Sequence, residues 1–162
     1  MKTKAIIGVG SNSGERLKNI SNTVDILKSE KEFSEIKVSA IYETKAFGYE
    51  EQPDFYNCAI SFLCEITLFE LFDYLKKTEK NIGRKETFKW GPREIDLDLL
   101  FFGSTIFCNE KLTVPHPGFC ERDFVIVPAC EIEPDFIHPV LKIILSEIRI
   151  EGLKQNIISK VL

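Results

Sequence analysis

The order in which strand-like and helix-like segments follow one another constrains the fold of this chain more than any other feature. Four short apolar or alternating runs indicate strands, at residues 5–9, 36–44, 55–65 and 95–102. Two longer segments repeat apolar residues with helical spacing, at residues 17–27 and 67–82. The order β-α-β-β-α-β is typical of an α+β domain of the ferredoxin-like type. We therefore expect a ferredoxin-like three-layer α-β-α sandwich with a mainly antiparallel sheet.

Polar residues mark the ends of the two expected helices. Asn12 with Glu15, and Thr67 with Glu70, have the spacing of capping boxes, in which each side chain bonds the backbone N–H of the other residue. Gly83 follows the second helix, where a residue with a left-handed backbone commonly ends it. We therefore expect one helix to begin after Asn12 and the other to end before Gly83.

The remaining segments are less regular. Residues 45–53 and 84–93 lack periodicity and contain glycine and proline, so we expect two loops there. Short strands and turns are expected between residues 103 and 117. Residues 124–132 are apolar on every side and fit either a helix or a strand, whereas the tail from residue 141 has the pattern of a helix.

Length and composition limit the functions that the chain can have. Its 162 residues suffice for one domain with its own core, over residues 1–162. The 21 basic and 25 acidic residues give a net charge of -4, which disfavours nucleic acid as a partner because such binding requires a strongly basic surface. The five cysteines include no C-x-x-C pair, and no segment is apolar enough to span a membrane. We therefore expect a cytoplasmic protein with reduced thiols and no membrane partner.

Two carboxylates interrupt the last of the expected strands. Side chains alternate along a strand, so Asp96 and Asp98 lie on one face while Ile95, Leu97 and Leu99 lie on the other. Two carboxylates ~7 Å apart on one face repel each other and require a compensating cation. Hard cations such as Mg²⁺ take carboxylate oxygens and often complete their coordination shell with phosphates. The alternative is a polar face of an edge strand that water solvates.

A basic loop precedes this strand. Trp90 and Arg93 belong to a Trp-Gly-Pro-Arg sequence directly before the carboxylates. Further basic residues lie on both sides of the strand, at Arg84, Lys85, Lys89, His116 and Arg122. Arginine binds phosphate through two parallel hydrogen bonds, so several basic residues beside an acid pair indicate a polyphosphate ligand. In this setting we expect Trp90 in a lid over the ligand, although a lone tryptophan also serves as a core anchor.

Glu79 lies on the apolar stripe of the second expected helix, between Leu75 and Ile82. A buried carboxylate there requires partners, and Arg84 or a bound ligand would supply them. The alternative is a glutamate at the edge of the stripe whose carboxylate reaches the solvent while its methylene groups cover apolar surface.

Five sequence blocks follow one another along the chain. They are Gly10-Ser11-Asn12, Glu43 to Gly48, Gln52-Pro53-Asp54-Phe55-Tyr56-Asn57, Trp90-Gly91-Pro92-Arg93-x-Ile95-Asp96-Leu97-Asp98 and Leu112-Thr113-Val114-Pro115-His116. Together they resemble the 6-hydroxymethyl-7,8-dihydropterin pyrophosphokinase family of folate biosynthesis, from about Ala5 to Glu131. The W-G-P-R-x-x-D-x-D block is highly specific, whereas the glycine-rich start is not.

The resemblance implies transfer of the β,γ-diphosphate of ATP to the hydroxymethyl group of the pterin, which gives the pterin diphosphate and AMP. It implies two Mg²⁺ ions held by Asp96 and Asp98, and mobile loops whose closure excludes water. It also implies a monomer that binds ATP and 6-hydroxymethyl-7,8-dihydropterin and associates with other folate-pathway enzymes. Either Asp96 or a water molecule on the metal would accept the hydroxyl proton.

The matching positions supply three sets of expected site residues. The catalytic set is Asp96, Asp98, Arg84, Arg93 and Trp90. The pterin set is Thr44, Phe47, Gly48, Phe55, Asn57, Asp96 and Phe124, in which Phe55 and Phe124 would stack on the two faces of the ring. The ATP set is Glu79, Arg84, Lys89, Trp90, Arg93, Leu99, Lys111, Thr113, His116 and Arg122.

Three positions depart from the family pattern. The loop before Trp90 is short and lacks a second arginine, so Lys85 or Lys89 would replace it without a bidentate fork. Lys45-Ala46 replaces prolines and should leave the first loop more flexible, and Pro117 replaces an aromatic residue on the adenine side. A non-catalytic nucleotide-binding domain is the alternative if the altered lid has abolished turnover. A ferredoxin-like RNA-binding module is a third interpretation, which the acidic strand disfavours.

Overall fold

Eight strands and three α-helices make up the fold. The computed structural model describes all 162 residues. The strands are β1 (Thr3–Ser11), β2 (Phe33–Val38), β3 (Tyr42–Thr44), β4 (Phe55–Cys64), β5 (Asp96–Phe102), β6 (Phe107–Cys108), β7 (Thr113–Val114) and β8 (Ile157–Lys160). The helices are α1 (Arg16–Ser29), α2 (Leu68–Ile82) and α3 (Asp123–Ile132), with 3-10 turns at Phe119–Glu121 and Leu145–Glu147. No helix has both the length and the apolar character needed to cross a membrane.

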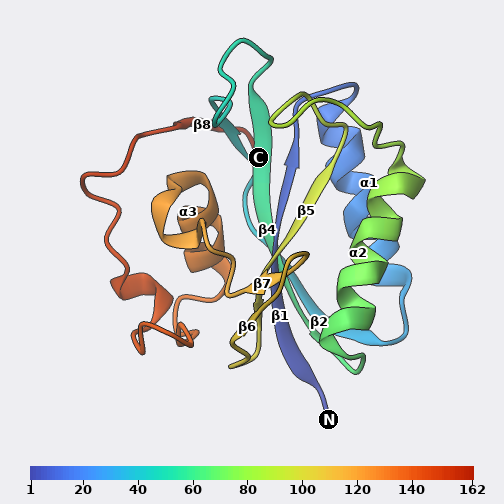
Figure 1. Cartoon of the computed structure of the whole chain (residues 1–162), viewed down its shortest axis with the longest axis vertical. Helices are drawn as coiled ribbons and strands as arrows, with labels where there is room; N and C mark the ends of the chain where they lie inside the picture. The colour runs from blue at the N-terminus through green and yellow to red at the C-terminus, as the bar shows by residue number, and fades with distance from the viewer.

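Six of the strands form one antiparallel sheet (Figure 1). The central strand β1 pairs with β4 on one side and with β5 on the other. β4 pairs with β2 along one half and with β3 along the other half, and β8 extends the sheet beyond β3. The short hairpin of β6 and β7 forms a separate sheet. This arrangement confirms the predicted ferredoxin-like sheet.

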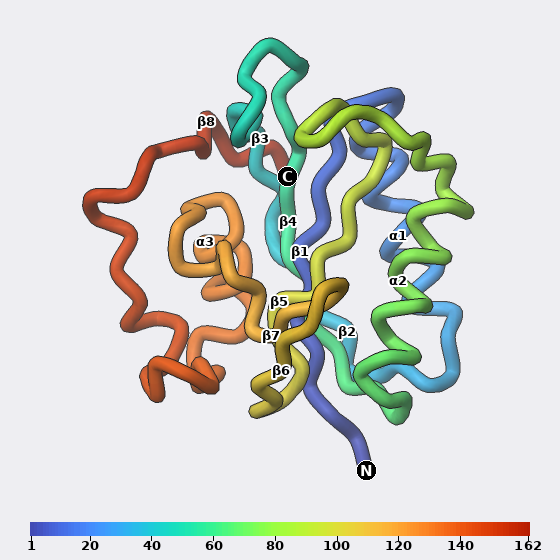
Figure 2. The backbone as a smooth tube through the Cα atoms, in the orientation of Figure 1, coloured from blue at the N-terminus to red at the C-terminus, as the bar shows by residue number.

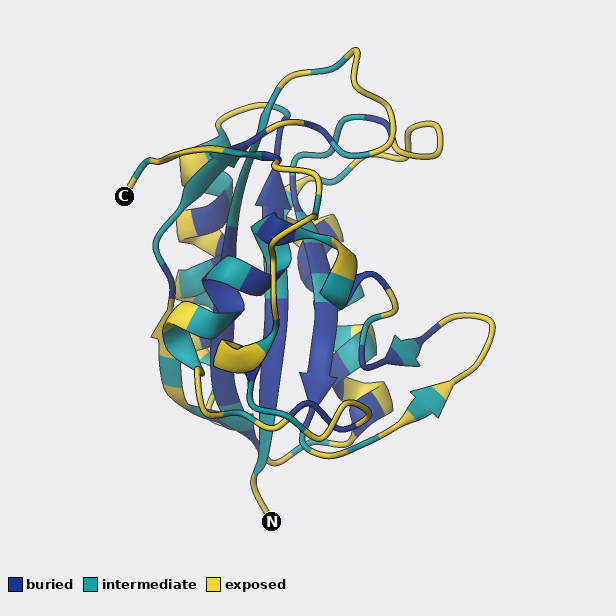
Figure 3. Cartoon of the chain, turned by 90° about the vertical axis from the view of Figure 1, so that its left-hand side faces the viewer, coloured by how far each residue is buried: buried dark blue, intermediate teal, exposed yellow.

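The helices cover the two faces of the sheet unequally (Figures 1 and 2). α1 and α2 pack side by side on one face, and α3 packs alone on the other. Side chains alternate along β1, so Ala5 and Ile7 enter the core under α1 and α2 while Ile6 enters the core under α3. Figure 3 shows the central strands buried between these layers and many loop residues exposed. The predicted three-layer sandwich is therefore confirmed.

Only one of the two predicted capping boxes forms. Thr67 and Glu70 bond to each other's backbone at the start of α2, and Gly83 ends that helix with a left-handed backbone (φ 113°). α1 begins after Glu15 without a side-chain cap, so the box predicted for Asn12 and Glu15 was wrong. The turn after β1 buries Asn12, whose side chain bonds to two loops instead of to the helix.

The strand predicted over residues 36–44 was also wrong, because this segment forms the two strands β2 and β3. The break lies at Ala40, whose N–H donates to the side chain of Glu131 (2.9 Å) rather than to a neighbouring strand. Glu35 has a left-handed backbone (φ 52°), and the register between β2 and β4 shifts there. β2 and β3 therefore lie along different halves of β4.

The C-terminal part settles one open alternative and overturns one prediction. Residues 124–132 belong to the helix α3. The helix predicted from residue 141 was wrong, because the chain makes a single 3-10 turn, packs Leu145 under α3 and then forms β8. Gly152 interrupts this segment with a left-handed backbone (φ 89°). Pairing with the free edge of β3 then satisfies the backbone of β8.

Candidate active site

A pocket lies on the α3 face of the sheet, at the end from which the loops 45–53 and 84–93 emerge (Figure 1). It holds about 730 Å³ of open space. Gly8 and Gly10 form part of its floor beside the paired acids, because Gly8 pairs with Asp98 and Gly10 with Asp96 between β1 and β5. A Cβ atom at Gly10 would lie only 2.6 Å from the side-chain oxygen of Asn57, so a larger residue there would displace this amide.

Asp96 is held by two arginines. Arg84 Nη1 lies 2.9 Å from one carboxylate oxygen, and Arg93 Nη1 lies 2.7 Å from the other. The alternative was that water solvates these carboxylates on an edge strand, and β5 is indeed an edge strand. However, only 19% of the Asp96 side chain is exposed, and both of its oxygens form ion pairs instead of facing water alone. The structure therefore brings the predicted carboxylate together with two of the predicted arginines.

Asp98 and His116 face each other, with 4.0 Å between Oδ2 and Nε2. Partial burial in the pocket, together with the negative charge of Asp96, raises the pKa of Asp98 to about 7. Burial and the neighbouring Arg122 guanidinium lower the pKa of His116 to about 4, so this imidazole is neutral at pH 7. The N–H of Gly118 donates to His116 Nδ1 (3.1 Å), which assigns the ring proton to Nε2, the nitrogen facing Asp98.

Aromatic side chains form another wall of the pocket. The Phe47 ring centroid lies 6.1 Å from that of Trp90 and 6.0 Å from that of Phe124. The Arg122 guanidinium lies 4.6 Å from the centre of the Phe47 ring, and Phe55 lines the same pocket from β4. Flat rings from both loops, one strand and one helix thus meet in one place, which suits a flat heterocyclic ligand.

The two loops touch each other over this wall. Trp90 has a left-handed backbone (φ 66°), and its indole ring covers Gly48, where a Cβ atom would lie 3.1 Å from the ring. Gly48 is itself left-handed (φ 91°), a conformation that favours glycine. Trp90 is 39% exposed and lies outside both core clusters. These observations favour the lid interpretation of Trp90 over the core anchor.

Asn57 supplies hydrogen-bonding groups beside the aromatic wall. Its Nδ2 donates to Thr44 Oγ1 (2.7 Å), which fixes the orientation of the amide. An amide offers both a donor and an acceptor, which suits the edge of a heterocycle. Thr44 is completely buried and does not line the pocket, so it contacts Asn57 rather than the open space.

Glu79 is buried behind the pocket, with 3% of its surface exposed, which settles the alternative left open by its position on the helix. Its carboxylate accepts the N–H of Leu97 (2.7 Å) and pairs with Arg84 (2.8 Å) and Lys76 (3.0 Å). Glu79 therefore orients Arg84, the arginine that reaches Asp96. It does not line the pocket, so a direct contact with ATP stays a prediction.

A second pocket shares Asp98 and His116 with the first one. Its other walls come from α2, β5 and the segment that contains β7, and they include the predicted residues Leu99, Lys111 and Thr113. Lys76 of α2 also lines it, a residue that the sequence pattern did not assign. Its only signal was its place one helical turn before Glu79. The two pockets meet at Asp98 and His116.

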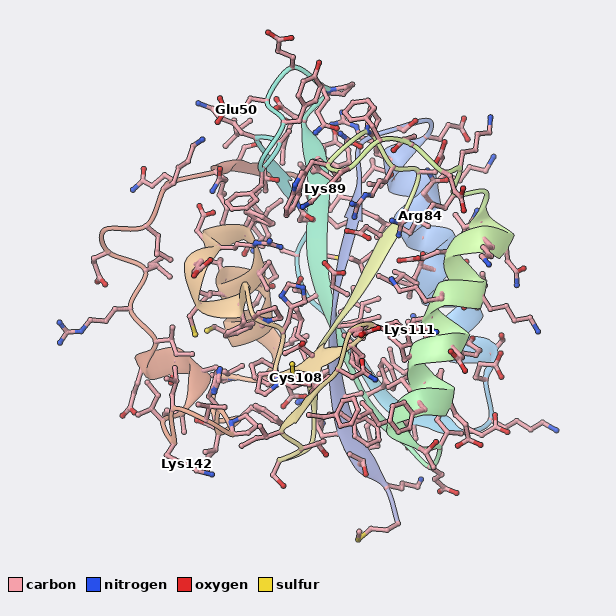
Figure 4. All side chains as sticks on the ribbon, viewed as in Figure 1. Glu50, Arg84, Lys89, Cys108, Lys111 and Lys142 are labelled. Atoms are coloured by element: carbon pink, nitrogen blue, oxygen red, sulfur yellow. The ribbon has the colours of Figure 1, made fainter.

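Besides Glu79, two predicted ATP contacts lie outside both pockets. Arg84 is engaged by Asp96, and Lys89 lies near the Trp90 ring, 5.9 Å from its centre. In Figure 4, which labels Arg84, Lys89 and Lys111, all three side chains come from segments that flank β5. The structure therefore places these cations around the site without bringing them all to its surface.

Asn12 and Gln52 contact both loops, although the sequence pattern gave neither of them a site role. Asn12 Nδ2 donates to Pro53 O (2.9 Å), and Asn12 Oδ1 accepts the N–H of Arg93 (2.8 Å). Gln52 Nε2 donates to Trp90 O (2.7 Å). Asn12 therefore ties the end of β1 to the two loops that cover the pocket. Its signal was the Gly-Ser-Asn turn, but an asparagine in a turn is equally typical of a helix cap.

Several known proteins are similar to this chain in sequence. The family model described as 7,8-dihydro-6-hydroxymethylpterin-pyrophosphokinase (HPPK) matches residues 6–134. A protein of Aquifex aeolicus (strain VF5) named 2-amino-4-hydroxy-6-hydroxymethyldihydropteridine pyrophosphokinase is 43% identical over 147 residues, which cover 90% of each chain. A protein of the same name from Bacillus subtilis (strain 168) is 39% identical over 132 residues, covering 82% of this chain and 79% of its own.

Two longer proteins contain a similar region. Folic acid synthesis protein FOL1 of Dictyostelium discoideum is 38% identical over 144 residues, which are 89% of this chain but only 22% of FOL1. The crystal structure of a triple mutant of Plasmodium falciparum HPPK-DHPS matches with a TM-score of 0.68 at 13% identity. That match covers 90% of this chain and 41% of the Plasmodium chain. At this identity the likeness supports the fold alone.

Proposed function

Because the chain belongs to the 7,8-dihydro-6-hydroxymethylpterin-pyrophosphokinase family, we infer that the pocket on the α3 face is its active site. The protein is a diphosphotransferase of folate biosynthesis that acts on 6-hydroxymethyl-7,8-dihydropterin. The β- and γ-phosphates of ATP move together to the hydroxymethyl oxygen, and AMP leaves. One observation carries the assignment of the site: a single pocket combines the paired carboxylates, the two arginines Arg93 and Arg122 and a wall of flat aromatic rings.

The pterin is proposed to bind at the aromatic end of this pocket. Phe55 and Phe124 would stack on the two faces of the ring, and Phe47 with Gly48 would cover its edge. Asn57 would bond the polar edge of the ring, with Thr44 holding the amide in place. The hydroxymethyl group would then point toward Asp96, the carboxylate at the start of β5.

ATP is proposed to extend from the first pocket, past the shared residues Asp98 and His116, into the second pocket. Arg93, His116 and Arg122 line the first pocket near the carboxylates and would contact the phosphates. The nucleoside would lie in the second pocket, beside Leu99, Lys111 and Thr113. Lys89 and Trp90 would close over the phosphates from the second loop.

Asp96 and Asp98 are proposed to hold two Mg²⁺ ions. Two carboxylates on one face are hard oxygen ligands, and no cluster of three or more His, Cys, Asp or Glu side chains forms a complete cage. This donor set fits Mg²⁺, which usually binds one or two carboxylates and completes its shell with water and substrate phosphates. Bound there, the ions would neutralise the phosphate charge and polarise the phosphorus under attack.

The chain itself contributes positioning and charge. Arg84 and Arg93 pair with Asp96 before substrates bind, and both would turn to the phosphates once cations take over that carboxylate. The neutral His116 presents an N–H group that would donate to a phosphate oxygen. Contact between Trp90 and Gly48 would exclude water and so suppress hydrolysis of ATP.

The wider setting is also part of the proposal. Residues 1–162 would act as one pyrophosphokinase domain, a cytoplasmic monomer that associates with other folate-pathway enzymes. In the Dictyostelium and Plasmodium proteins, the region similar to this chain occupies only 22% and 41% of a longer chain. Such longer chains support association of this activity with neighbouring enzymes.

A product assay tests this function. Purified protein, ATP, Mg²⁺ and 6-hydroxymethyl-7,8-dihydropterin should yield AMP and pterin diphosphate in equal amounts, and omission of either the pterin or Mg²⁺ should abolish both products. Tight nucleotide binding without any AMP would favour the alternative, a non-catalytic nucleotide-binding domain. Formation of ADP in place of AMP would contradict transfer of a diphosphate.

A further inference from the structure

The C-terminal segment joins two sides of the proposed pterin pocket, although it lies outside residues 6–134, the region that the family model matches. The chain leaves the far end of α3, passes around the outside of this helix and returns to β8 beside β3 (Figures 1 and 2). Asn156 lies just before β8 and is 1% exposed. It contacts both the first turn of α3 and the start of the loop 45–53.

Asp123 anchors this segment to α3. Its carboxylate accepts four hydrogen bonds, from the backbone N–H groups of Phe124 (2.8 Å), Asn156 (2.9 Å) and Ile157 (3.0 Å) and from Asn156 Nδ2 (3.2 Å). Asp123 is only 6% exposed, so these N–H groups replace water around its charge. Hydrogen bonds to a carboxylate are short and strong, and they fix the segment against the first turn of the helix.

The same segment holds the first loop. The carbonyl oxygen of Asn156 accepts the N–H of Lys45 (2.9 Å), at the point where β3 ends and the loop begins. Lys154 forms an ion pair with Glu50, which Figure 4 shows in the loop at the outer end of the molecule. β8 then pairs with β3 and continues the connection along the sheet edge. The segment therefore contacts the loop at two separate places.

We propose that Asp123 and Asn156 are positioning residues for the pterin, which set the distance between Phe124 on one side and the loop 45–53 on the other. The inference rests on the proposed function, because it takes the pterin to bind at this aromatic wall. Neither residue lines the pocket. Their effect passes through Phe124 and Phe47, whose ring centroids are 6.0 Å apart.

Apart from Arg122, which directly precedes Asp123, the nucleotide side of the site has a different support. Lys111 and Thr113 lie at the β6–β7 hairpin, and the N–H of His116 bonds to Leu100 O in β5 (2.9 Å). None of these three residues bonds to the C-terminal segment. Loosening of the segment should therefore weaken pterin binding more than nucleotide binding, which a general loss of stability would not do.

The test compares Asp123→Asn with a matched control, Glu133→Gln. Glu133 follows the last residue of the same helix and anchors that end to β1 and β4, through Lys4 (3.0 Å) and Ser61 (2.7 Å). Both variants exchange a hydrogen-bonded carboxylate for its amide, so both should unfold at a lower temperature. The dissociation constant of the Mg²⁺ complex of a non-hydrolysable ATP analogue is measured by calorimetry. That of 6-hydroxymethyl-7,8-dihydropterin is measured with this complex at saturation, and the KM of each substrate is measured alongside.

Asp123→Asn should raise the dissociation constant and the KM of the pterin about tenfold, the effect expected for weakened charge-assisted hydrogen bonds. The dissociation constant of the ATP analogue and the KM of ATP should change less than about threefold, which is a smaller change in binding free energy than the tenfold change for the pterin. Asn156→Ala removes one side-chain hydrogen bond but keeps the Asp123 carboxylate and the backbone N–H groups that bond to it. This variant should therefore also raise the dissociation constant of the pterin, but by a smaller factor. The double variant Asp123→Asn with Asn156→Asp swaps the two side chains and so restores a carboxylate–amide pair. It should recover part of the pterin affinity that Asp123→Asn alone loses. Glu133→Gln should leave both substrates near their wild-type values.

Two results would overturn the inference. The first is a parallel loss of pterin and ATP affinity, and the second is an unchanged pterin affinity in folded Asp123→Asn. If Asp123→Asn does not fold, the ratio of pterin to ATP effects in Asn156→Ala decides in the same way. A wild-type protein that neither binds the pterin nor forms AMP is a different outcome, because it refutes the proposed function and this inference falls with it.

Discussion

The two faces of the sheet differ in how completely helices cover them. The core under α1 and α2 contains 19 buried residues, whereas the core under α3 contains eight. On the covered face, Leu97 and Leu99 of β5 are at most 4% exposed. On the other face, Asp96 and Asp98 of the same strand line an open pocket. The single helix on the α3 face thus leaves part of the sheet open, and the proposed site occupies that part.

This difference has a consequence for substitutions in β5. Neighbouring residues point to opposite faces, so they should affect different properties of the protein. Changes at Asp96 or Asp98, which line the pocket on the α3 face, should reduce activity with little loss of stability. A change at Leu97, which is buried on the α1 and α2 face, should reduce stability and leave turnover of the folded protein at saturating substrate concentrations in place.

The largest expected effect is on turnover, in the variant Asp96→Asn. Loss of one carboxylate from the proposed metal site removes charge stabilisation of the transferred phosphates, so kcat should fall on the order of 1000-fold. The rate of AMP formation measures this effect. Asp73→Asn, which changes an exposed carboxylate on α2, is the control and should have wild-type turnover. Near-normal turnover of Asp96→Asn would remove Asp96 from the catalytic residues.

Leu97→Ala tests the opposite face of the same strand. Leu97 is 1% exposed in the core under α1 and α2, so truncation should lower the free energy of unfolding by about 3 kcal/mol. Urea denaturation followed by circular dichroism measures this loss. The kcat of the protein that remains folded should stay within about twofold of the wild type, a change well under 1.4 kcal/mol in the barrier. A folded Leu97→Ala protein without activity would break the separation between the two faces.

A pair of glycine variants sharpens the description of the pocket floor. A Cβ atom at position 10 would lie 2.6 Å from Asn57 Oδ1, whereas one at position 8 would meet Leu100 at an ordinary 3.7 Å. Gly10→Ala should displace the Asn57 amide and raise the KM of the pterin about tenfold, and Gly8→Ala should have a clearly smaller effect. Steady-state kinetics with varied pterin measures both. Equal effects would mean that Asn57 does not bind the pterin.

The smallest expected effect is a pH dependence of stability that Asp98 causes in metal-free protein, because the side chain of Asp98 is 37% exposed and solvent screens its charge. Its pKa is raised to about 7 in the folded protein, while an unfolded aspartate titrates near ~3.9. The folded state therefore binds the proton more tightly, and stability should fall as the pH rises between these two values. Asp98→Asn removes this decline, so it should be more stable than the wild type at pH 8 and lose that advantage toward pH 4. Urea denaturation in EDTA measures the difference, and a constant difference across this range would contradict it.

Much of the fold, and the carboxylates and arginines of the site, were predictable from the sequence. The alternation of Asp96, Leu97 and Asp98 fixed which face each side chain takes, because strand periodicity is a local property. Thr67 and Glu70 marked the start of α2 for the same reason, since a capping box needs only neighbouring residues. The basic loop before β5 also delivered two arginines to Asp96, as its sequence position indicated.

The features that the sequence did not predict depend on contacts between distant segments. Asn12 carries the local pattern of a helix cap, but bonds to Pro53 and Arg93 hold it elsewhere. The tail from residue 141 has a helical pattern, yet the free edge of β3 draws its end into a strand. Asp123 begins an apolar segment and has only the N–H of Phe124 as a local partner, whereas Asn156, its main partner, is 33 residues away. In each case tertiary contacts override local propensity.

A crystal structure of the protein with Mg²⁺, a non-hydrolysable ATP analogue and 6-hydroxymethylpterin tests most directly whether the site lies on the incompletely covered face. We expect the pterin ring between Phe55 and Phe124, the phosphates beside Arg93 and His116, and cations on Asp96 and Asp98. Ligands bound on another face of the molecule, or a pterin bound away from the aromatic wall, would contradict this assignment.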